Sequence, residues 1–449
     1  MLKTSKSWWL ACCGLLTAPA AFAVDLVGVH DLAFKNDPRL RAAEYRREAV
    51  GENRIQARAN FLPQIGGDAR KTWGTSKTSI SGVEISDVDI DNESWGATLR
   101  QSLYRQANFE SMDIARAQIS EADAIYQIAF EDFLVRVAER YFLVLTLTDG
   151  VTFAEAEEKA FQRQYEQAEQ RFEVGLTAVT DVHEAKASYD NARARAIVAR
   201  NNLADAKEAL RELTGTYFEE YDNLQAVLPL VEPDPPNSEN WVQMALASSP
   251  AVLSLVAAVD VAESNVGLQK SGHYPSLDLV ANYSNFTNNE YLIRDDFQNP
   301  IGTTSLGVDD ATVGLVLSVP IYEGGSVSSR TRQARYLLDA RSQDLEDVQR
   351  STVRQTRNAY RGVIGSIEEV GAFGQALISA QSAVEATQAG FEVGTRTIVD
   401  VLIAEQRYYQ AQRDNSLARH AYILNHLRLK RVAGLLTSED LAVVNQLLE

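Results

Sequence analysis

Residues that commonly carry chemistry are few in this sequence and lie far apart. The histidines are His30, His183, His273, His420 and His426, and no two of them have metal-site spacing with a carboxylate partner. His420 and His426 stand six positions apart, so they do not share one helix face, and we expect both on a helix surface. The acids Glu155, Glu157 and Glu158 are typical of a solvated helix face. We expect no metal and no cofactor.

Enzyme motifs are also missing from the sequence. It contains no Gly-rich phosphate loop and no nucleophile elbow. The pairs Gly66-Gly67 and Gly324-Gly325 are typical of strand and strand-to-helix boundaries. The sequence therefore predicts that the protein is not an enzyme.

One acid-bearing motif occurs twice. Residues 172–182 return 219 positions later as residues 391–401, and 13 of 44 positions are identical when 172–215 is laid on 391–434. In each copy a Gly follows a helical stretch, and an acid, Asp181 or Asp400, stands where the next helix begins. Such an acid can stabilise the free N–H groups of a helix start. Each copy predicts the tip of a helical hairpin.

The N-terminus has the pattern of a secretory signal peptide. Residues 1–23 carry Lys3 and Lys6, then an apolar run over 8–18, and then Ala21-Phe22-Ala23. That run is too short for a membrane-spanning helix, so we expect cleavage after Ala23. A lipoprotein signal that ends at Cys12 is the alternative.

Composition narrows the class of protein further. Loss of Lys3 and Lys6 changes the formal charge from −18 to 41 − 61 = −20, which disfavours nucleic-acid binding. The only cysteines, Cys12 and Cys13, lie in the signal peptide. No later stretch approaches the roughly 20 consecutive apolar residues of a spanning helix. A membrane crossing would therefore need a β-barrel.

Proline positions divide the chain into two similar halves. Residues 64–228 and 321–449 contain no proline, so both permit long helices. Pro38 matches Pro250 and Pro63 matches Pro275, both at an offset of 212. We expect an internal duplication, with a first repeat over residues 24–230, a Pro-rich linker over 231–240 and a second repeat over 241–449.

Alternating apolar and polar residues predict two strands in each half. They lie at 64–73 and 94–104 in the first half and near 277–284 and 313–321 in the second. The polar segments 74–93 and 287–311 between them are expected to be long loops. Four strands are too few to close a barrel, so we expect a barrel shared between chains, with a soluble sandwich sheet as the alternative.

Long helices are predicted to follow each strand pair. The segments 105–172 and 326–391 have apolar residues at coiled-coil spacing, and some 67 helical residues would extend on the order of 100 Å. Returning helices are expected over 181–213 and 400–432. Internal glycines such as Gly150 and Gly371 weigh against unbroken helices.

Several motifs, taken together, identify a family. They are Phe61-Leu62-Pro63-Gln64, Arg171-Phe172-Glu173-Val174-Gly175-Leu176 with Thr180-Asp181-Val182, Pro320-Ile321-Tyr322-Glu323-Gly324-Gly325, Val393-Gly394-Thr395-Arg396-Thr397-Ile398-Val399-Asp400-Val401-Leu402, and Leu436-Thr437-Ser438-Glu439-Asp440-Leu441. With these motifs the sequence resembles the TolC family of outer-membrane efflux channels over almost its whole length.

This resemblance implies an α+β membrane protein. The resemblance also implies a homotrimer, in which a twelve-stranded outer-membrane β-barrel continues into a long periplasmic α-helical barrel. It works with a periplasmic adaptor protein and an inner-membrane transporter of the RND or ABC type, in efflux or type I secretion. The implied function is a passive conduit, opened by outward movement of the periplasmic helix tips. A trimeric adhesive or structural stalk without a pore is the alternative.

The same resemblance implies roles for tip residues. Contact with the adaptor is implied for Val174, Gly175, Leu176, Val393, Gly394 and Thr395. A periplasmic gate is implied for Thr180, Asp181, Phe391, Arg396 and Asp400, with Phe391 in place of the usual tyrosine. The alternatives are that the glycines only form turns, that Arg396 lies on an exposed turn, and that Asp400 only stabilises a helix start. Ile403 stands where the family commonly has a second acid.

Overall fold

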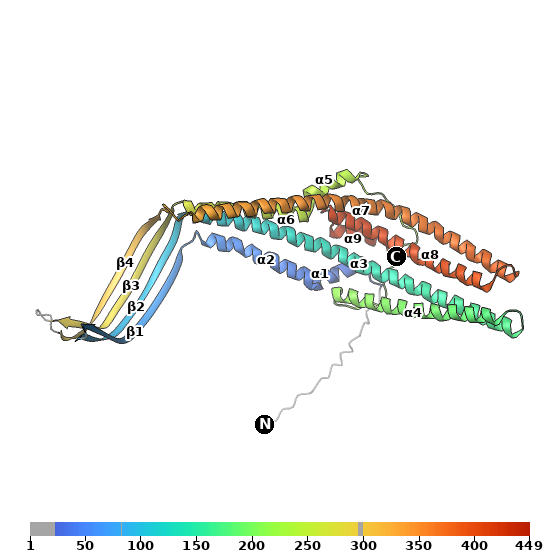
Figure 1. Ribbon diagram of the computed structural model, residues 1–449, viewed down its shortest axis with the longest axis horizontal. Coiled ribbons are helices and arrows are strands. Elements are labelled where there is room, and N and C mark those ends of the chain that lie inside the picture. Colours follow the sequence, from blue (N-terminus) through green and yellow to red (C-terminus); the bar gives the residue numbers. More distant parts are fainter. Residues whose placement is uncertain (1–22, 82, 295–299) are drawn as a thin grey trace, which may run out of the picture.

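The computed structural model describes residues 23–81, 83–294 and 300–449. The molecule is elongated, with a β-sheet at one end, two helical hairpin tips at the other and a helical body between them (Figure 1). The expected signal peptide, residues 1–23, lies outside the described residues apart from Ala23, and its cleavage stays a prediction.

The elements confirm the internal duplication. The first half contains α1 (Leu26–Asn36), α2 (Pro38–Ala59), β1 (Gln64–Ile80), β2 (Val83–Arg105), α3 (Gln106–Glu173) and α4 (Val179–Thr214). The second half contains α5 (Ser238–Ser248), α6 (Pro250–Lys270), the short 3-10 helix η1 (Ser271–His273), β3 (Ser276–Arg294), β4 (Pro300–Ser318), α7 (Ser326–Glu392), α8 (Ile398–Val432) and α9 (Ser438–Asn445). Two strands, a long helix and a returning helix follow a shorter helix in both halves.

The strands form one antiparallel sheet in the order β1-β2-β3-β4. Leu99, Ala281 and Val313 are direct cross-strand partners on one face. Their neighbours Thr98, Asn282 and Thr312 lie on the other face, where Thr98 Oγ1 donates a hydrogen bond to Asn282 Oδ1 at 2.9 Å. One face is therefore apolar and the other polar near the helical body, as predicted.

The strands are longer than the sequence pattern predicts. β1 continues to Ile80 and β2 begins at Val83, so the expected loop 74–93 is mostly strand. β3 and β4 likewise cover much of the expected loop 287–311. The prediction was wrong because it required an apolar face. Here backbone pairing continues beyond the alternating pattern, and Lys71 forms ion pairs with Asp91 and Glu93 across the strands.

The long helices of the body are continuous. α3 has 68 residues and α7 has 67, in agreement with the predicted segments 105–172 and 326–391. Gly150 and Gly371 lie within these helices without a break, and no atom lies close to where a Cβ would stand at either position. Helical hydrogen bonding therefore outweighs the small propensity cost of an isolated glycine.

The main hydrophobic core lies about halfway along α3, where α1, α4, α8 and α9 surround it. Its members are large buried side chains and include Leu26, Phe133, Tyr141, Phe142, Leu210, Leu436 and Leu441. The two ends of the described chain also meet here. Val24 N donates to Glu220 O at 3.1 Å, and Glu449 N donates to Asn223 O at 2.8 Å.

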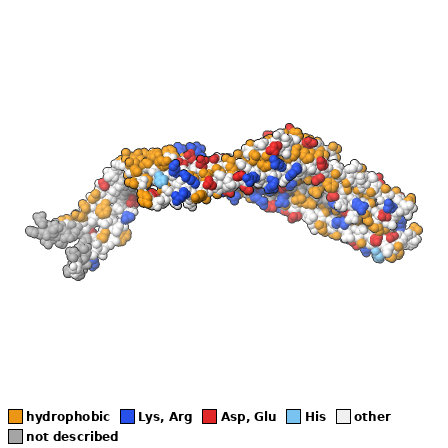
Figure 2. All heavy atoms as spheres, turned by 45° about the horizontal axis from the view of Figure 1, so that its top comes forward, with side chains coloured by type: hydrophobic (Ala, Val, Ile, Leu, Met, Phe, Trp, Pro, Cys, Tyr) orange, Lys and Arg blue, Asp and Glu red, His pale blue; other side chains and the backbone are white. Residues whose placement is uncertain are grey.

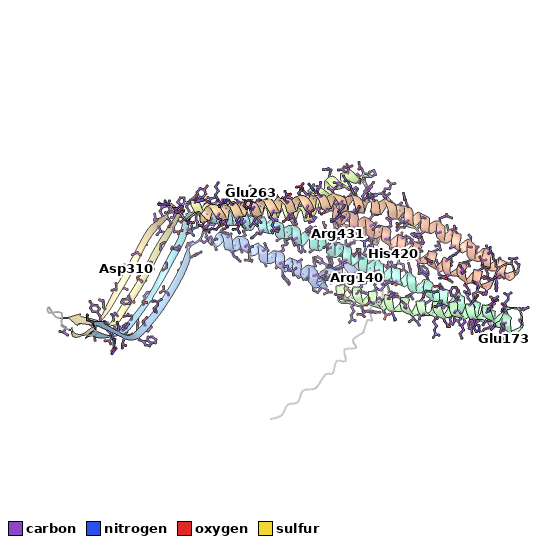
Figure 3. All side chains as sticks on the ribbon, in the orientation of Figure 1. Arg140, Glu173, Glu263, Asp310, His420 and Arg431 are labelled. Atoms are coloured by element: carbon purple, nitrogen blue, oxygen red, sulfur yellow. The ribbon has the colours of Figure 1, made fainter. Side chains whose placement is uncertain are left out.

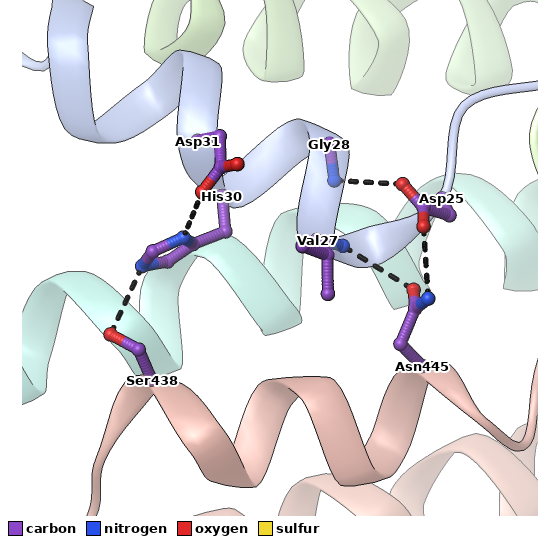
Figure 4. A network of polar contacts seen from close by, with 7 residues as sticks. All are labelled: Asp25, Val27, Gly28, His30, Asp31, Ser438 and Asn445. Atoms are coloured by element: carbon purple, nitrogen blue, oxygen red, sulfur yellow. Dashed lines mark hydrogen bonds and ion pairs between the residues drawn. The ribbon is translucent and has the colours of Figure 1, made fainter.

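Polar contacts join α1 to α9 at the same level (Figure 4). Asn445 Nδ2 donates to Asp25 Oδ2 at 2.9 Å, while Asn445 Oδ1 accepts from the backbone of Leu26 at 2.9 Å. Ser438 and His30 are 3.3 Å apart, Oγ to Nε2. The N-terminal segment, the inter-repeat segment and the C-terminal segment therefore form one belt.

One helical stretch of the described chain is long and apolar enough to cross a membrane, judged by length and composition alone. It is Ser238–His273, with a mean hydropathy of 1.8 over its most apolar window. The stretch is interrupted at Ser249-Pro250, between α5 and α6, and α6 lies against α3 and α7. Figure 2 shows hydrophobic side chains gathered where the helical body meets the sheet.

Candidate functional site at the hairpin tips

Both hairpin tips have the same backbone turn. Gly175 has φ 77° and Gly394 has φ 81°, a left-handed conformation that L side chains adopt only with strain. Leu176 N donates to Arg171 O at 2.8 Å, and Thr395 N donates to Gly390 O at 2.8 Å. Each glycine therefore ends its long helix in a Schellman motif.

Apolar side chains are exposed around these glycines. Val174 is 69% exposed, and Leu176 and Val393 are each 75% exposed. No atom lies within 4 Å of a Cβ built on Gly175 or Gly394, so the tips are open as well as apolar. Exposed apolar side chains grouped on a protruding turn are typical of a protein-docking surface. The adaptor contacts stay a prediction.

Asp400 takes part in a capping box at the start of α8. Thr397 N and Thr397 Oγ1 each donate to Asp400 Oδ2 at 2.9 Å, and Asp400 N donates to Thr397 Oγ1 at 3.3 Å. The hydrogen bond from the Thr397 backbone is the main reason why the pKa of Asp400 is lowered. Asp400 therefore stabilises a helix start, and this use leaves its charge in place.

The first tip has no such box. Thr177 Oγ1 donates to Asp181 Oδ2, whereas the residue before α4 is Ala178, which has no side-chain acceptor. Thr180 is exposed beside it. The two copies of the motif therefore keep the acid and differ in how it is held.

Phe391 makes a contact that the sequence did not predict. The guanidinium carbon of Arg171 lies 4.6 Å from the centre of the Phe391 ring, a cation–π contact between the end of α3 and the end of α7. Because Phe391 has no hydroxyl group, it cannot donate a hydrogen bond here. Its ring still joins the two hairpins of one chain.

Arg396 lies on the turn of the second tip, exposed, with its Cγ 2.8 Å from the position of a Cβ on Gly390. A side chain at position 390 would displace it. Within the described residues, no hydrogen bond or ion pair joins Arg396 to Thr180 or Asp181 of the same chain. A gate contact of Arg396 would have to form between copies of the chain, and it stays a prediction.

A small apolar cluster holds the two hairpins together just behind the tips. Its buried members are Phe161, Ala168, Ala185, Ala192, Ile398 and Leu402, and Phe391 packs against them. Tyr165 and Tyr189 stack with ring centres 6.2 Å apart. Ile403 is 42% exposed and lines a groove between α4 and α8. The tips are therefore packed within one chain by few side chains.

Polar contacts continue this junction along α3 and α8. Glu157 is fully buried on α3, and its carboxylate lies 2.9 Å from the Arg195 guanidinium of α4 and 3.4 Å from that of Arg413 on α8. Closer to the tip, Gln164 Nε2 donates to Glu405 Oε1 at 3.2 Å. We call the contacts of Glu157, Gln164, Arg413 and Glu405 the hairpin seam.

Two sequence predictions about α3 and α8 were wrong. Glu157 was expected on a solvated helix face together with Glu155 and Glu158, and it is buried because two guanidinium groups compensate its charge. His420 was expected on a helix surface; it is 4% exposed, and its Nδ1 lies 2.7 Å from Thr146 Oγ1. Burial lowers the pKa of His420 to about 4. Figure 3 shows His420 inside the body and Glu173 at the tip.

The seam residues were missed because their partners lie far away in the sequence. Glu157 and Arg413 are 256 positions apart. One signal in the sequence could have indicated that Glu157 is buried. Phe161 and Ala168 follow Glu157 by four and eleven positions, a spacing that places all three on the same face of the helix. Within the described residues, no group of three or more His, Cys, Asp or Glu side chains could hold a metal ion.

The sequence matches the family model described as outer membrane efflux protein over residues 29–216 and 241–435. It is 38% identical to the outer membrane protein TolC of Vibrio cholerae, over 95% of this chain and 94% of that protein. It is 33% identical to TolC of Escherichia coli, over 95% of this chain and 85% of that protein. It is 30% identical to the alkaline protease secretion protein AprF of Pseudomonas aeruginosa, over 99% and 91%.

Solved structures share the fold. The CusC channel superimposes with a TM-score of 0.75 at 18% identity and covers 94% of this chain and 95% of CusC. The outer membrane channel CmeC of Campylobacter jejuni gives 0.75 at 16% identity, over 99% and 97%. These matches are channels, and none supports a stalk without a pore. The chain therefore belongs to the outer membrane efflux protein family, and it is a TolC-like efflux or secretion channel of the outer membrane with a long periplasmic helical part.

Proposed function

We propose that three copies of this chain close one twelve-stranded barrel. The observation that supports this is the open sheet, since β1 and β4 each have a free edge. An unpaired edge in a membrane leaves backbone N–H and C=O groups without partners, which costs several kcal/mol per group. Pairing β4 of one copy with β1 of the next removes every free edge.

Cysteine crosslinking tests the trimer. Ala69 lies on the edge strand β1 and Val313 on the edge strand β4. Each test variant carries one Cys on β1 and one on β4. A series of such pairs, starting from these two positions, covers the possible registers between β4 of one copy and β1 of the next. Native mass measurement should give three chains, and oxidation should link copies in a ladder that ends at three. A monomer by both measurements would refute the shared barrel.

The proposed mechanism is a passive conduit that opens at its periplasmic tips. In this mechanism α7 and α8 swing outward from α3 and α4, while the belt around the main core holds the helices halfway along the body. The hairpin seam is the part that must separate, because it joins α8 to α3 between the core and the tips. Arg396 and Asp181 of neighbouring copies would contact each other in the closed state.

The tips are the proposed docking surface for a periplasmic adaptor. Val174, Leu176 and Val393 offer exposed apolar side chains, and Gly175 and Gly394 allow a partner backbone to approach closely. An inner-membrane transporter of the RND or ABC type would supply the energy. Among the relatives, AprF is named for alkaline protease secretion and CzcC for cobalt-zinc-cadmium resistance.

A further inference from the structure

A cavity outside the hairpin tips has the properties of a ligand site. It lies in the belt, between the Pro-rich segment 229–234, α8 and α9, and has a volume of about 440 Å³. Its walls are mainly apolar and include Pro229, Ile423, Leu427 and Val444. Pockets of several hundred Å³ with apolar walls and a few polar groups are the usual form of a small-molecule site.

The walls are held in place by their own hydrogen bonds. Tyr422 Oη accepts from Val231 N at 2.8 Å, and His426 Nε2 lies 3.1 Å from Val231 O. Trp241 Nε1 donates to Pro235 O at 2.9 Å. Because these polar atoms have partners within the wall, their rings present apolar surface to the cavity. Such a preformed cavity needs little rearrangement to bind a ligand.

The charges at the cavity are unbalanced. Lys430 is neutralised by Asp440, since Lys430 Nζ lies 2.5 Å from Asp440 Oδ1. Glu232 and Asp234 are exposed at the cavity, and neither is in an ion pair with any described residue. Burial lowers the pKa of His426, which disfavours a positive charge on the imidazole. Two carboxylates without an ion-pair partner among the described residues therefore line an otherwise mainly apolar cavity.

We propose that this cavity binds an organic cation with an apolar body, which occupies the space between α8 and α9 while its charge faces Glu232 and Asp234. A cation fits because an anion would meet two like charges, and a neutral molecule would gain nothing from them. The site lies in the belt, so it is neither the proposed docking surface at the tips nor the proposed strand edges.

Tetraphenylphosphonium and tetraphenylborate are the probes for a test, because they have the same shape and opposite charge. The full-length channel would be placed in phosphatidylcholine nanodiscs and titrated calorimetrically, with empty nanodiscs as the blank. We expect the phosphonium to bind with a Kd of roughly tens of micromolar, and the borate to show no binding beyond the blank. Equal binding of both ions would refute the charge argument.

Variants then locate the binding. Glu232→Gln with Asp234→Asn should weaken phosphonium binding about tenfold, which corresponds to about 1.4 kcal/mol. The matched control is Glu219→Gln with Glu220→Gln, which removes the same charge from exposed residues outside the cavity. Equal weakening in both double variants would refute a local site.

A third variant blocks the cavity. Val443 is 61% exposed at its wall, so Val443→Trp should fill the opening without disturbing the core and should abolish binding. If the wild-type channel bound no phosphonium, the proposal would be wrong. Chemical labelling of Val443→Cys would then show whether a neighbouring copy covers the cavity, in which case the cavity is a subunit contact.

Discussion

At the scale of single residues, two glycines determine the shape of the tips. Gly175 and Gly394 adopt positive φ with open space around them. Replacement by Ala should cost about 1 to 2 kcal/mol locally, from strain alone. Replacement by Trp should in addition block close approach of a partner. Cargo export measured in cells should then be lost, while trimers remain.

A helical glycine supplies the control for that prediction. Gly371→Trp adds the same side chain in open space on α7, at a residue without positive φ, and should leave export close to wild type. Loss of the trimer in Gly175→Trp or Gly394→Trp would contradict the prediction, since the glycines would then be needed for folding alone.

Substitution of Asp400 can separate two roles of its carboxylate, capping of α8 and a negative charge in the pore. Asn at position 400 can still accept a hydrogen bond from Thr397, but it has no charge. If three copies of Asp400 line the pore, Asp400→Asn should reduce cation selectivity, measured as a shift in reversal potential across a salt gradient. An unchanged reversal potential would show that the acid serves the helix start only.

His420 makes stability depend on pH. Its pKa is about 4 in the folded protein and about 6.5 in an unfolded chain, so the fold favours the neutral ring. The contribution of His420 to the free energy of unfolding is therefore fully present above pH 6.5 and is lost as the pH falls toward 4. The loss reaches about 3 kcal/mol at most, at 1.36 kcal/mol per pH unit.

Thermal unfolding between pH 7 and pH 4.5 measures this effect. His420→Gln should be less stable than wild type at pH 7 and should lose less stability on acidification. His183→Gln, at an exposed helix position, is the matched control and should follow the wild-type profile. An identical pH dependence in wild type and His420→Gln would contradict the assignment.

At the scale of elements, the hairpin seam joins α3 to α8 between the main core and the tips. It lies beside the small apolar cluster behind the tips, and its fully buried Glu157 forms ion pairs with α4 and α8. Glu157→Gln leaves two half-exposed arginines without a counter-charge, which should cost about 1 to 2 kcal/mol. Amide hydrogen exchange near Arg413 should accelerate about tenfold.

Glu155→Gln is the control for the seam. Glu155 pairs with Arg200 at 2.9 Å in an exposed position, so its loss should change exchange little. Equal acceleration in both variants would mean that Glu157 has no special part in holding the hairpins together.

Much of the element plan could be predicted from local pattern. Proline-free arms and turn glycines located α3, α4, α7 and α8 to within about two residues. The strand ends could not be predicted, because beyond the apolar face only backbone pairing defines a strand. The seam could not be predicted either, since Glu157 and Arg413 meet through tertiary packing. Repeat boundaries at 24–230 and 241–449, joined by 231–240, remain a proposal.

At the scale of the whole molecule, sheet, belt and tips have separate tasks. The sheet gives a membrane-facing apolar side, the belt fixes the helices halfway, and the tips beyond it are held by fewer contacts. Membership of the family shows that the protein is a channel. The proposed trimer is argued from the free strand edges, the proposed adaptor contact from the exposed tips, and the proposed gating from the seam.

The central claim is that the conduit opens by separation of the hairpin seam. Cys12 and Cys13 are the only cysteines in the sequence, and the predicted cleavage after Ala23 would remove both, so an introduced disulfide would meet no competing thiols. Gln164→Cys with Glu405→Cys places a thiol on α3 and on α8 where the two side chains now form a hydrogen bond. Each single variant serves as the control.

The deciding measurement is single-channel conductance of this double variant in a planar bilayer, before and after addition of a reductant. The oxidised channel should stay in a low-conductance state, and reduction should produce larger or longer openings, while the single variants should not respond. If the oxidised channel conducted as fully as the reduced one, with the disulfide confirmed by mass, opening would not involve the seam and the proposed mechanism would be wrong.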